Sequence, residues 1–500
     1  MNNYISCVAV DIINYDKPPA SLAFLAGACE QAQQPYQCFS LNSAFLDEMS
    51  IDGYNEIYTK LKLGLMHELP DRAVGVIDNI IEQIKTSSTT TVVVSLFSFV
   101  QYPVARFFLE RLKTAMPNIE VIAGGPGVQS QHSAGITIGK NLLDSNLVDY
   151  YCLGEGDVVL VEFLKGQRKI LGINGKKDLF ESWVPQIQDL DDKYVLPSYK
   201  KMSLKNYQNL ENKQSTVFSL STSRGCVRAC SFCDVAKTWP KFRFRKGASI
   251  AQEVLKHHLE VGAVHFTIVD SLINGSLKSF NEFNREMIKL RQQHVSLKDF
   301  SYNGMFIVRD RGTHNEEFFA NMQAAGCESL AIGVETGSER LRFDMNKKFT
   351  NRDLDHHLEM CQKYGIRNSF LMFVGYPTET QQDFDETMLM LERYQKYLID
   401  DTILGINHSG VFSMLADTPV FDNRDDIGLV IDEQFGIDEA AMSKLNWTNT
   451  NNPDLTVKER ILRDLKFRKK AVELRYPIPY SNRYLEYLKH INHDLFVLPD

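Results

Sequence analysis

The sequence lacks several features that mark specialised classes of protein. Its 500 residues include no run of about eighteen apolar residues, the length that a membrane-spanning helix needs. The 55 Lys and Arg are outnumbered by 63 Asp and Glu, so the net charge of −8 offers no general attraction to a nucleic-acid backbone. There is no internal repeat and no low-complexity tract. These absences argue against a membrane protein and against a nucleic acid as the partner.

The first residues also lack the features of a secretory signal, namely a charged region, an apolar stretch and a cleavage site. At 44% apolar and 24% charged residues, the composition is ordinary for a globular protein. A chain of this length exceeds what one hydrophobic core usually organises. We therefore expect a soluble, cytoplasmic protein of two or three domains.

Cysteine is scarce, and its distribution is uneven. Nine cysteines in 500 residues are too few for a disulfide scaffold. Three of them lie within a stretch of eight residues: Cys226, Cys230 and Cys233. The other six stand singly among apolar neighbours, and we interpret them as buried small hydrophobic residues: Cys7, Cys29, Cys38, Cys152, Cys327 and Cys361.

The sequence does contain a regular alternation of short apolar runs and helical patterns. In residues 1–166 this alternation predicts βαβ units and a doubly wound, Rossmann-like parallel sheet. Strands are predicted at 7–11, 36–41, 91–96, 119–123 and 149–153. Two of these strands run into glycine turns, G-G-P-G at 124–127 and G-E-G-D at 154–157. Sheets of this class bind ligands in turns at the carboxyl ends of their strands.

The remaining chain divides by the strength of its periodicity. Residues 167–207 are weakly periodic, and we interpret them as a linker or covering segment. Residues 208–425 contain six strand patterns, at 215–221, 264–269, 300–308, 329–334, 367–374 and 401–406. They predict a partial TIM-like β/α barrel with functional residues at the carboxyl ends of its strands. Ser249 and Gln252 predict a capping box for a helix at 250–261. Residues 426–500 are expected to form a mostly helical extension.

The three clustered cysteines follow the first barrel strand with the spacing C-x3-C-x2-C. Three thiolates on one loop can hold three corners of a [4Fe–4S] cubane and leave the fourth iron open to a ligand. A zinc site with a distant fourth ligand is an alternative, but zinc sites usually show paired C-x2-C spacings and no second pair occurs here. Buried structural cysteines are another alternative. The pattern favours a catalytic iron–sulfur cluster on Cys226, Cys230 and Cys233.

At this segment the sequence resembles the radical S-adenosylmethionine (SAM) superfamily, whose C-x3-C-x-aromatic-C loop it matches in full, including Phe232. The resemblance implies that SAM chelates the open iron and that electron transfer cleaves it to a 5′-deoxyadenosyl radical. It also implies an external one-electron donor such as a flavodoxin or a ferredoxin. A binding protein with a structural zinc or redox-sensing cysteine site is the non-enzymatic alternative, and it predicts no SAM binding.

Two later strand ends resemble SAM-binding segments of the same family. Residues 333–338, G-V-E-T-G-S, are similar to a segment whose polar groups meet the ribose and methionyl part of SAM, which makes Glu335 and Ser338 candidates. A surface carboxylate at a helix N-terminus is the alternative for Glu335. The turn with Gly375 and Pro377 is similar to the family's G-x-P-x-E-T turn, whose backbone packs against adenine.

Further polar residues at strand ends are candidates for the same ligand. Arg309 can pair with the SAM carboxylate or form a buried structural ion pair. Asp270 and Asn274 lie in a segment that resembles the branch with an N-terminal cobalamin-binding-like domain, and either can receive the SAM ammonium group or cap the next helix. The alternating aromatic and cationic residues at 241–246 indicate an edge strand with a solvated cationic face, with contact to an anionic substrate as the alternative.

An α/β domain ahead of such a barrel resembles the cobalamin-binding-like domain of that branch. Gly124, Gly125, Gly154 and Glu155 lie where the branch has its markers. The D-x-H-x-x-G motif that supplies an axial histidine in other cobalamin proteins is absent. The resemblance therefore implies cobalamin held against backbone, and a domain that only covers the barrel or carries substrate is the alternative.

Together these resemblances imply a cobalamin-dependent methyltransferase acting on a small-molecule or natural-product-like substrate. The alternative is a radical reaction without methylation, such as cyclisation, rearrangement or sulfur insertion, with an empty N-terminal domain. Residues 405–422 are expected to close the barrel near the substrate. Within them, His408 is either a proton donor or a satisfied core histidine.

Overall fold

A computed structural model describes residues 4–11, 17–133, 136–176, 189–207, 216–415, 418–431 and 447–478. The chain divides into two compact units, and each is described by itself. Unit 1 comprises Met1–Leu220, Ala248–Thr267 and His294–Phe300, and unit 2 comprises Ser221–Gly247, Ile268–Gln293 and Ser301–Asp500. One helix and most of one strand from the middle of the chain therefore belong to the N-terminal unit.

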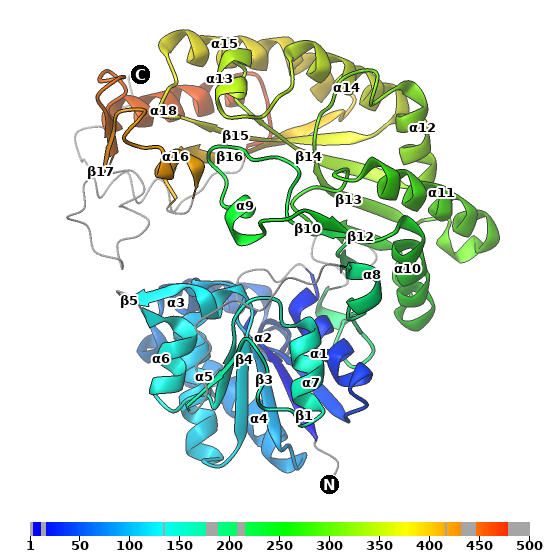
Figure 1. The fold of residues 1–500 in the computed structure, drawn as a ribbon, viewed down its shortest axis with the longest axis vertical. Helices are drawn as coiled ribbons and strands as arrows, with labels where there is room; N and C mark the ends of the chain where they lie inside the picture. Colours follow the sequence, from blue (N-terminus) through cyan, green and yellow to red (C-terminus); the bar gives the residue numbers. More distant parts are fainter. Residues whose placement is uncertain are drawn as a thin grey trace. The chain divides into compact units, whose positions relative to one another are not determined.

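Unit 1 contains a six-stranded sheet with the order β2-β1-β3-β4-β7-β8 (Figure 1). Five strands are parallel, and β8 runs antiparallel to β7 at one edge. The strands are β1 (Ile5–Ala9), β2 (Tyr36–Ser40), β3 (Thr91–Ser95), β4 (Glu120–Gly124), β7 (Tyr150–Cys152) and β8 (Ile173–Gly175), beside a short hairpin of β5 (Gln131–Ser133) and β6 (Ile136–Thr137). The predicted doubly wound sheet is confirmed, with an antiparallel edge strand in addition.

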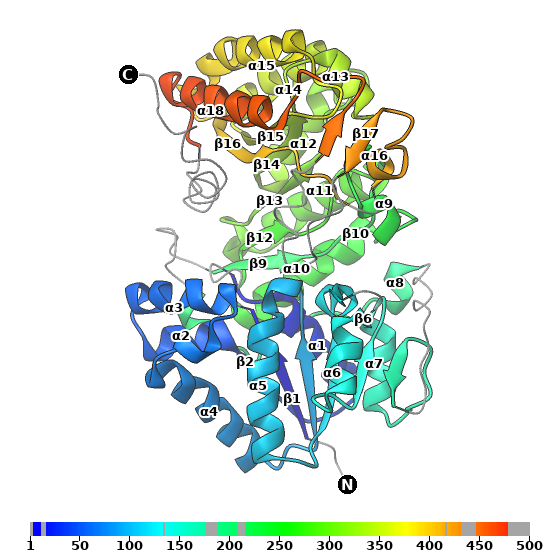
Figure 2. The ribbon, with the colours of Figure 1, turned by 90° about the vertical axis from the view of Figure 1, so that its left-hand side faces the viewer.

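Helices cover both faces of this sheet because its central strands are buried on both sides (Figure 2). α1 (Ala20–Gln31) and α7 (Asp157–Leu164) pack on one face. α4 (Asp71–Thr86), α5 (Tyr102–Ala115) and α6 (Ile138–Asp144) pack on the other. The shorter flanking helices are α2 (Leu41–Glu48), α3 (Ile51–Leu63) and α8 (Leu190–Lys193). Because helices cover both faces, the loops that can bind a ligand lie at the carboxyl ends of the strands.

The single cysteines are less isolated than their spacing suggested. Cys7 and Cys38 face each other in register on β1 and β2, and the Cys7 and Cys29 sulfurs lie 3.6 Å apart. Cys38 is only half-buried, whereas the other five are buried as expected. These contacts bring residues of three elements together, which spacing along the chain does not show.

A second six-stranded sheet has the order β16-β15-β14-β13-β12-β9, which is the order of the strands in the chain. Its strands are β9 (Val217–Leu220), β12 (His265–Ile268), β13 (Ser301–Phe306), β14 (Cys327–Glu335), β15 (Arg367–Val374) and β16 (Ile403–Val411). The pairs from β13 to β16 are parallel. The helices along this part of the chain are α9 (Val235–Thr238), α10 (Gly247–Val261), α11 (Leu277–Gln293), α12 (Glu316–Ala325), α13 (Glu339–Asp344), α14 (Asn351–Tyr364) and α15 (Gln381–Tyr394). The predicted partial β/α barrel is confirmed.

Two local predictions in the barrel were wrong. α10 begins at Gly247 and not at Ile250, so Ser249 lies inside the first turn and not before the helix, and the Gly247 N–H donates to the carboxylate of Glu282. In the cationic run, Arg243 and Arg245 are buried rather than solvated. Arg245 donates from its guanidinium to the Ser221 carbonyl, because a short hairpin of β10 (Ser223–Arg224) and β11 (Arg243–Phe244) turns these side chains inward.

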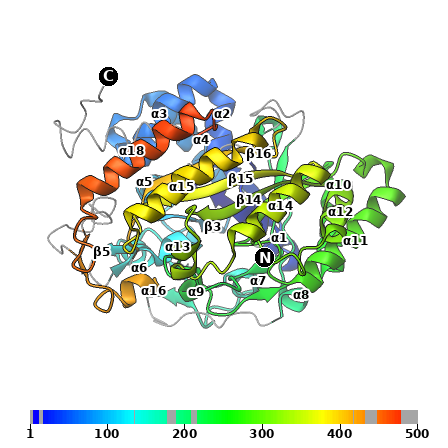
Figure 3. The ribbon, with the colours of Figure 1, turned by 90° about the horizontal axis from the view of Figure 1, so that it is seen from above.

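The C-terminal segment packs on the barrel strands. It holds α16 (Pro419–Asp422), a hairpin of β17 (Leu429–Ile431) and β18 (Trp447–Asn449), and the long helix α18 (Val457–Glu473). Figure 3 shows α18 alongside α15, and α18 also contacts β15 and β16. Trp447 and Leu455 share a hydrophobic cluster with Phe373 and Tyr376 of the barrel. The described extension therefore combines a helix with a hairpin. In the part of the chain that the structure covers, we see no helix with the length and hydropathy to cross a bilayer.

Candidate active site

The three clustered cysteines lie on one loop between β10 and α9. Cys230 is buried, and Cys226 and Cys233 are half-buried. The loop is narrow at its start because Gly225 has a φ of +84°, and a side chain there would collide with the Lys241 carbonyl. The Arg228 N–H donates to the Cys226 sulfur at 3.3 Å. The loop therefore presents all three thiols from one short stretch of backbone.

Burial keeps these thiols protonated unless a cation accompanies them. It raises the pKa of Cys230 to about 11 and also raises the pKa values of Cys226 and Cys233, while the charge of Lys347 opposes the rise. A metal that binds thiolates supplies the missing positive charge. Within the described ranges, no three His, Cys, Asp or Glu side chains are arranged to hold a single metal ion. The donor set is three sulfurs on one loop, which is the set that a cubane with one open iron requires.

A buried ion pair lies beside the cysteine loop. Lys347 Nζ is 2.9 Å from Glu335 Oε1, and the side chains are 16% and 10% exposed. Glu335 ends β14 with a φ of +64°, an uncommon conformation for a non-glycine residue. Burial lowers the pKa of Lys347, but attraction to Glu335 and Cys230 outweighs it and raises the net value, so the lysine keeps its charge. The surface position considered for Glu335 is excluded.

Backbone contacts explain how Lys347 reaches the cysteines. The Ser231 N–H donates to the Met345 carbonyl, and the Asn346 side chain donates to the Ala229 carbonyl. Both bonds tie the loop after α13 to the cysteine loop. Lys347 Nζ lies 5.8 Å from the centre of the Phe232 ring, whose edge packs on Phe373.

Arg309 is half-buried near the same loop, and its guanidinium is only partly hydrogen-bonded. Its Nη2 donates to the carbonyls of Asn274 and Gly275 at 3.2 and 3.4 Å. Its Nε is buried, and it has no hydrogen-bond partner among the described residues; the same holds for Nε of Arg228. Burial and then repulsion from Arg228 lower the pKa of Arg309. Two guanidinium groups that repel each other and retain free donors suit an anionic ligand.

Asp270 and Asn274 are engaged with the protein itself. Both Asp270 oxygens accept from the Thr222 N–H at 3.0 Å, and one also accepts from the Ser223 hydroxyl. Asn274 donates to the Ile307 carbonyl at 2.8 Å and accepts from the Ile307 N–H at 2.9 Å. Neither residue caps α11 in these contacts. They fix the loop after β12, which in turn carries the carbonyls that hold Arg309.

Ser338 is buried at the start of α13. Its hydroxyl donates to Asp383 at 2.6 Å and accepts from the Leu341 N–H, so Ser338 is the N-cap of the helix. Arg340 pairs with the same aspartate. Burial raises the pKa of Asp383, but the hydrogen bonds that its carboxylate accepts from Arg340 and Ser338 outweigh burial and lower the pKa to about 2. The Ser338 hydroxyl therefore points into the protein, where it fixes the segment between β14 and α13.

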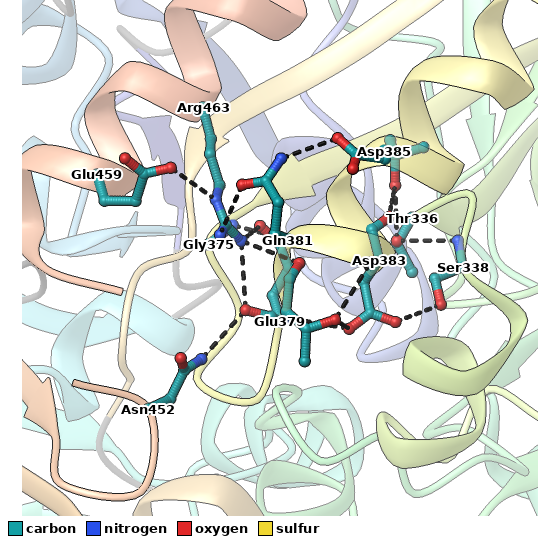
Figure 4. A network of polar contacts seen from close by, with 12 residues as sticks. Thr336, Ser338, Gly375, Glu379, Gln381, Asp383, Asp385, Asn452, Glu459 and Arg463 are labelled. Atoms are coloured by element: carbon teal, nitrogen blue, oxygen red, sulfur yellow. Dashed lines mark hydrogen bonds and ion pairs between the residues drawn. The ribbon is translucent and has the colours of Figure 1, made fainter. Parts of the chain in front are cut away.

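The turn after β15 contacts both the cysteine loop and the C-terminal segment, and Figure 4 shows its contacts with Asn452 and Arg463 of the latter. The Tyr376 hydroxyl bonds to the Ser231 hydroxyl at 2.7 Å. Gly375 has a φ of +77°, and its N–H donates to Glu379. The Pro377 carbonyl accepts from Asn449 and Asn452. The turn that resembles the adenine-binding segment is thus fixed at both ends.

The barrel holds an open cavity whose lining mixes apolar and polar residues. A cavity of about 370 Å³ is lined by Glu335, Leu371, Met372, Asn407, His408 and Ser409. Asn407 and Ser409 alternate with buried residues along β16 and are exposed, and Leu371 stands in register with Asn407. His408 itself bonds to the Met372 carbonyl and to Asp464 of α18 through its two ring nitrogens. It is a satisfied core histidine rather than a proton donor.

In unit 1, the predicted glycine turns lie at the carboxyl ends of β4 and β7. Gly125 has a φ of +102°, and a side chain there would collide with the Leu96 carbonyl, so this glycine permits two loops to approach each other. Gly124 and Gly154 belong to the same edge, and Glu155 is buried. The loop after β3 exposes two aromatic rings, Phe97 at 64% and Phe99 at 55%. This edge therefore combines backbone turns with an apolar surface.

The sequence patterns did not identify three residues of the site. Lys347 lies in the loop after α13, so no strand end marked it as a candidate. Arg228 lies between Cys226 and Cys230, so its place in the cysteine loop could be seen from the sequence. Arg463, which bonds Glu379 from α18, had no local signal because it lies 84 residues away in the chain.

A family model described as the radical SAM superfamily matches residues 220–391. An uncharacterized methyltransferase of Pyrococcus horikoshii is 25% identical over 287 residues, which are 55% of this chain and 58% of that protein. An anaerobic magnesium-protoporphyrin IX monomethyl ester cyclase of Synechocystis is 23% identical over 293 residues, which are 57% of this chain and 55% of that protein. The chain spans less than two thirds of the length of these curated relatives.

Two solved structures share the fold over nearly the whole chain. The radical SAM methyltransferase TsrM of Kitasatospora setae, with cobalamin and a [4Fe–4S] cluster bound, has a TM-score of 0.65 over 98% of this chain and 96% of that chain, at 15% identity. The cobalamin-dependent SAM radical enzyme OxsB, with aqua-cobalamin bound, has a TM-score of 0.64 over 98% of this chain and 70% of that chain, also at 15% identity. Residues 220–391 of this chain therefore match the radical SAM domain, and a domain of this family implies a [4Fe–4S] cluster and SAM as cofactors.

Proposed function

We propose that this protein is a cobalamin-dependent radical SAM methyltransferase with a small-molecule substrate. The observation that carries the proposal is the arrangement around the cysteine loop, where three thiols lie beside the Lys347–Glu335 pair and near the unpaired Nε of Arg309. A cluster ligand set, a cation close to the sulfurs and a free guanidinium donor are what a chelated amino-acid ligand requires.

Each residue has a separate task in this proposal. Cys226, Cys230 and Cys233 hold the cluster, and Lys347 offsets the negative charge of the thiolates. Arg309, supported by Arg228, receives the carboxylate of SAM. When bound, the cluster and SAM together supply one-electron cleavage of a carbon–sulfur bond.

Glu335 receives a polar group of the ribose or methionyl part of SAM, and Gly375 and Pro377 shape the turn against adenine. Phe232 closes the cysteine loop on its apolar side. Asp270, Asn274 and Ser338 act through the loops that they fix, since their polar atoms already bond to protein.

Cobalamin fits the carboxyl edge of the unit 1 sheet. The exposed rings of Phe97 and Phe99 offer an apolar surface, and the turns at Gly124, Gly125 and Gly154 offer backbone without side chains in the way. When bound, cobalamin supplies a carrier for a methyl group. The fold shared with TsrM and OxsB supports the same assignment.

The barrel cavity supports a small, neutral substrate. A volume of about 370 Å³ is in the range of small-molecule sites. The only carboxylate in its lining is Glu335, which Lys347 neutralises, and Asn407 and Ser409 offer uncharged hydrogen-bonding groups.

The proposal is tested on anaerobically purified protein, reconstituted with iron and sulfide and supplied with cobalamin, SAM and a reductant. Iron, retained corrin, 5′-deoxyadenosine and S-adenosylhomocysteine are quantified for the wild type, for Cys230→Ala and for the matched control Cys38→Ala. We expect about four irons per chain in the wild type and in Cys38→Ala, and SAM cleavage that Cys230→Ala abolishes. Zinc in place of iron, or no SAM binding, would overturn the radical SAM assignment.

The amount of retained corrin distinguishes a cobalamin-dependent methyltransferase from a radical SAM enzyme that does not use cobalamin. About one corrin per chain, with transfer of a methyl group to cobalt, supports the methyltransferase. Iron and SAM cleavage without retained corrin contradict the cobalamin assignment and leave a non-methylating radical reaction.

A further inference from the structure

The turn at residues 375–380 is held from outside the barrel by the C-terminal segment. The family match ends at residue 391, whereas several of the side chains that contact this turn come from residues 447–463. Figure 4 shows Arg463 descending from α18 to the turn and Asn452 approaching from the hairpin side. The shape of a turn inside the matched domain therefore depends on residues beyond it.

Arg463 makes the densest set of contacts. Its Nη1 donates to Glu379 Oε1 at 2.8 Å and to the carbonyls of Glu379 and Thr380 at 3.2 Å each. The two side chains are 5% and 3% exposed. The second carboxylate oxygen of Glu379 accepts from the Gly375 N–H at 3.0 Å. A continuous path of charge-assisted bonds thus links α18 to the first residue of the turn.

Arg460 fixes the same glycine by packing. Gly375 has a φ of +77°, and a side chain at this position would meet the aliphatic part of Arg460. The Arg460 guanidinium stacks 3.5 Å from the centre of the Trp447 ring and donates to the Trp447 carbonyl at 2.9 Å. The glycine is therefore enclosed by α18 and β18.

The residues on and after β18 add further contacts to the turn. Asn449 donates to the Pro377 carbonyl at 2.9 Å, and Asn452 donates to the carbonyls of Pro377 and Glu379 at 3.2 and 3.1 Å. With the Thr380 carbonyl bonded to Arg463, three carbonyls of this short turn accept from C-terminal side chains. On its opposite side, Tyr376 bonds to Ser231 of the cysteine loop. The turn is a bridge between the cluster loop and the C-terminal segment.

We infer that Arg463 is a positioning residue for SAM, and that the C-terminal segment sets the affinity of the enzyme for the adenosine part of SAM through the turn at 375–380. The inference rests on the proposed function, because it takes this turn to be the adenine-binding backbone. Arg463 acts through Glu379 and the main chain and does not itself contact the ligand. A lysine cannot replace it, because a single ammonium group does not reproduce a guanidinium that bonds Glu379 through Nη1 and Glu459 through Nε at the same time.

The test compares four forms of the reconstituted, full-length protein by anaerobic calorimetric titration with S-adenosylhomocysteine. Arg463→Lys keeps the charge and loses the fork. Arg463→Met combined with Glu379→Gln removes both charges, so that no buried charge is left without its partner. Lys470→Met is the matched control, since it breaks an ion pair between α18 and α15 at Glu392, away from the turn. Iron content and melting temperature are measured for every form.

We expect both Arg463 variants to bind S-adenosylhomocysteine about tenfold or more weakly, the scale of one lost charge-assisted hydrogen bond, while iron content is unchanged. Lys470→Met should bind as the wild type does. Unchanged affinity in the double variant, with only a lower melting temperature, would show a purely structural role and overturn the inference. If the wild type itself binds no S-adenosylhomocysteine, the proposed function fails first, so the two failures are distinguishable.

Discussion

Lys347 and Glu335 form an ion pair that Gly333 makes possible. The two charged atoms lie 2.9 Å apart, and a side chain on Gly333 would overlap both the Glu335 carboxylate and the Lys347 ammonium group. Gly333 belongs to a β-bulge in the pairing of β14 with β15, which places Glu335 in its left-handed conformation. A backbone irregularity at one strand end thus sets the charge next to the cysteine loop.

Gly333→Ala is expected to displace this pair and weaken SAM binding about tenfold, because buried charges that lose their geometry lose most of their attraction. Calorimetric titration with SAM measures the effect at constant iron content. Gly75→Ala is the control, since that glycine lies within helix α4 and has nothing within 4 Å of an added side chain. The control should be neutral or slightly stabilising. Equal SAM affinity in Gly333→Ala and the wild type would contradict the role given to the pair.

Arg309→Lys and Arg309→Met should both weaken SAM binding, the second by about tenfold to a hundredfold, because a bidentate partner of the SAM carboxylate is lost. Decarboxylated SAM lacks that group and serves as the matched ligand. Its affinity should change little in either variant. A similar loss for both ligands would show that Arg309 only supports the loop after β12.

The double substitution Phe97→Ser and Phe99→Ser is expected to lower the corrin retained per chain at least severalfold, since it removes the exposed aromatic surface at the carboxyl end of β3. Absorbance of bound cobalamin after gel filtration measures it. Ile399→Ser, at an exposed apolar residue of unit 2, is the control. Wild-type corrin content in the double variant would place cobalamin elsewhere on the chain.

Ser338→Ala should lower the free energy of unfolding by about 1–2 kcal/mol, because the helix α13 loses its N-cap and Asp383 loses a hydrogen bond. Chemical denaturation checks this value. SAM affinity should stay within about twofold of the wild type, because the serine hydroxyl points into the protein. A large loss of affinity without a loss of stability would mean that Ser338 contacts the ligand directly.

Two buried histidines give the protein an acid-sensitive stability. Burial lowers the pKa of His357 to about 4 and that of His314 to about 3, whereas the unfolded chain titrates near 6.5. Between these values the unfolded state binds more protons, so the free energy of unfolding falls as the pH falls from about 6.5 to 4, by up to about 1.4 kcal/mol per pH unit for each histidine.

His357→Gln keeps a hydrogen-bonding partner for Asn368, and it should make this pH dependence shallower by about 1 kcal/mol per pH unit. Urea unfolding between pH 7.5 and 5 measures the slope. Comparison with His67→Gln, at an exposed histidine, removes the contribution of other titrating groups. Parallel slopes in the wild type and His357→Gln would contradict the assignment.

The sequence alone was sufficient for the order of the elements and for the cysteine loop. Strands and helices depend on local periodicity, and the C-x3-C-x2-C spacing is local as well, so Cys226, Cys230 and Cys233 could be identified without a fold. The six barrel strands were predicted within a few residues for the same reason. Local sequence patterns predicted helix ends less reliably. Ser249 predicted a helix start at residue 250, whereas α10 begins at Gly247, whose N–H donates to Glu282.

Only the tertiary structure decided which polar residues remain available at the site. Asp270, Asn274 and Ser338 looked equivalent to Arg309 and Glu335 as polar residues at strand ends, but hydrogen bonds to Thr222, Ile307 and Asp383 occupy the first three. The partners that matter most lie far apart in the chain, 84 residues for Arg463 and Glu379. Such pairs depend on the register of strands and on helix packing, which no local pattern encodes. They determine which charged groups are paired within the protein and which can bind a ligand.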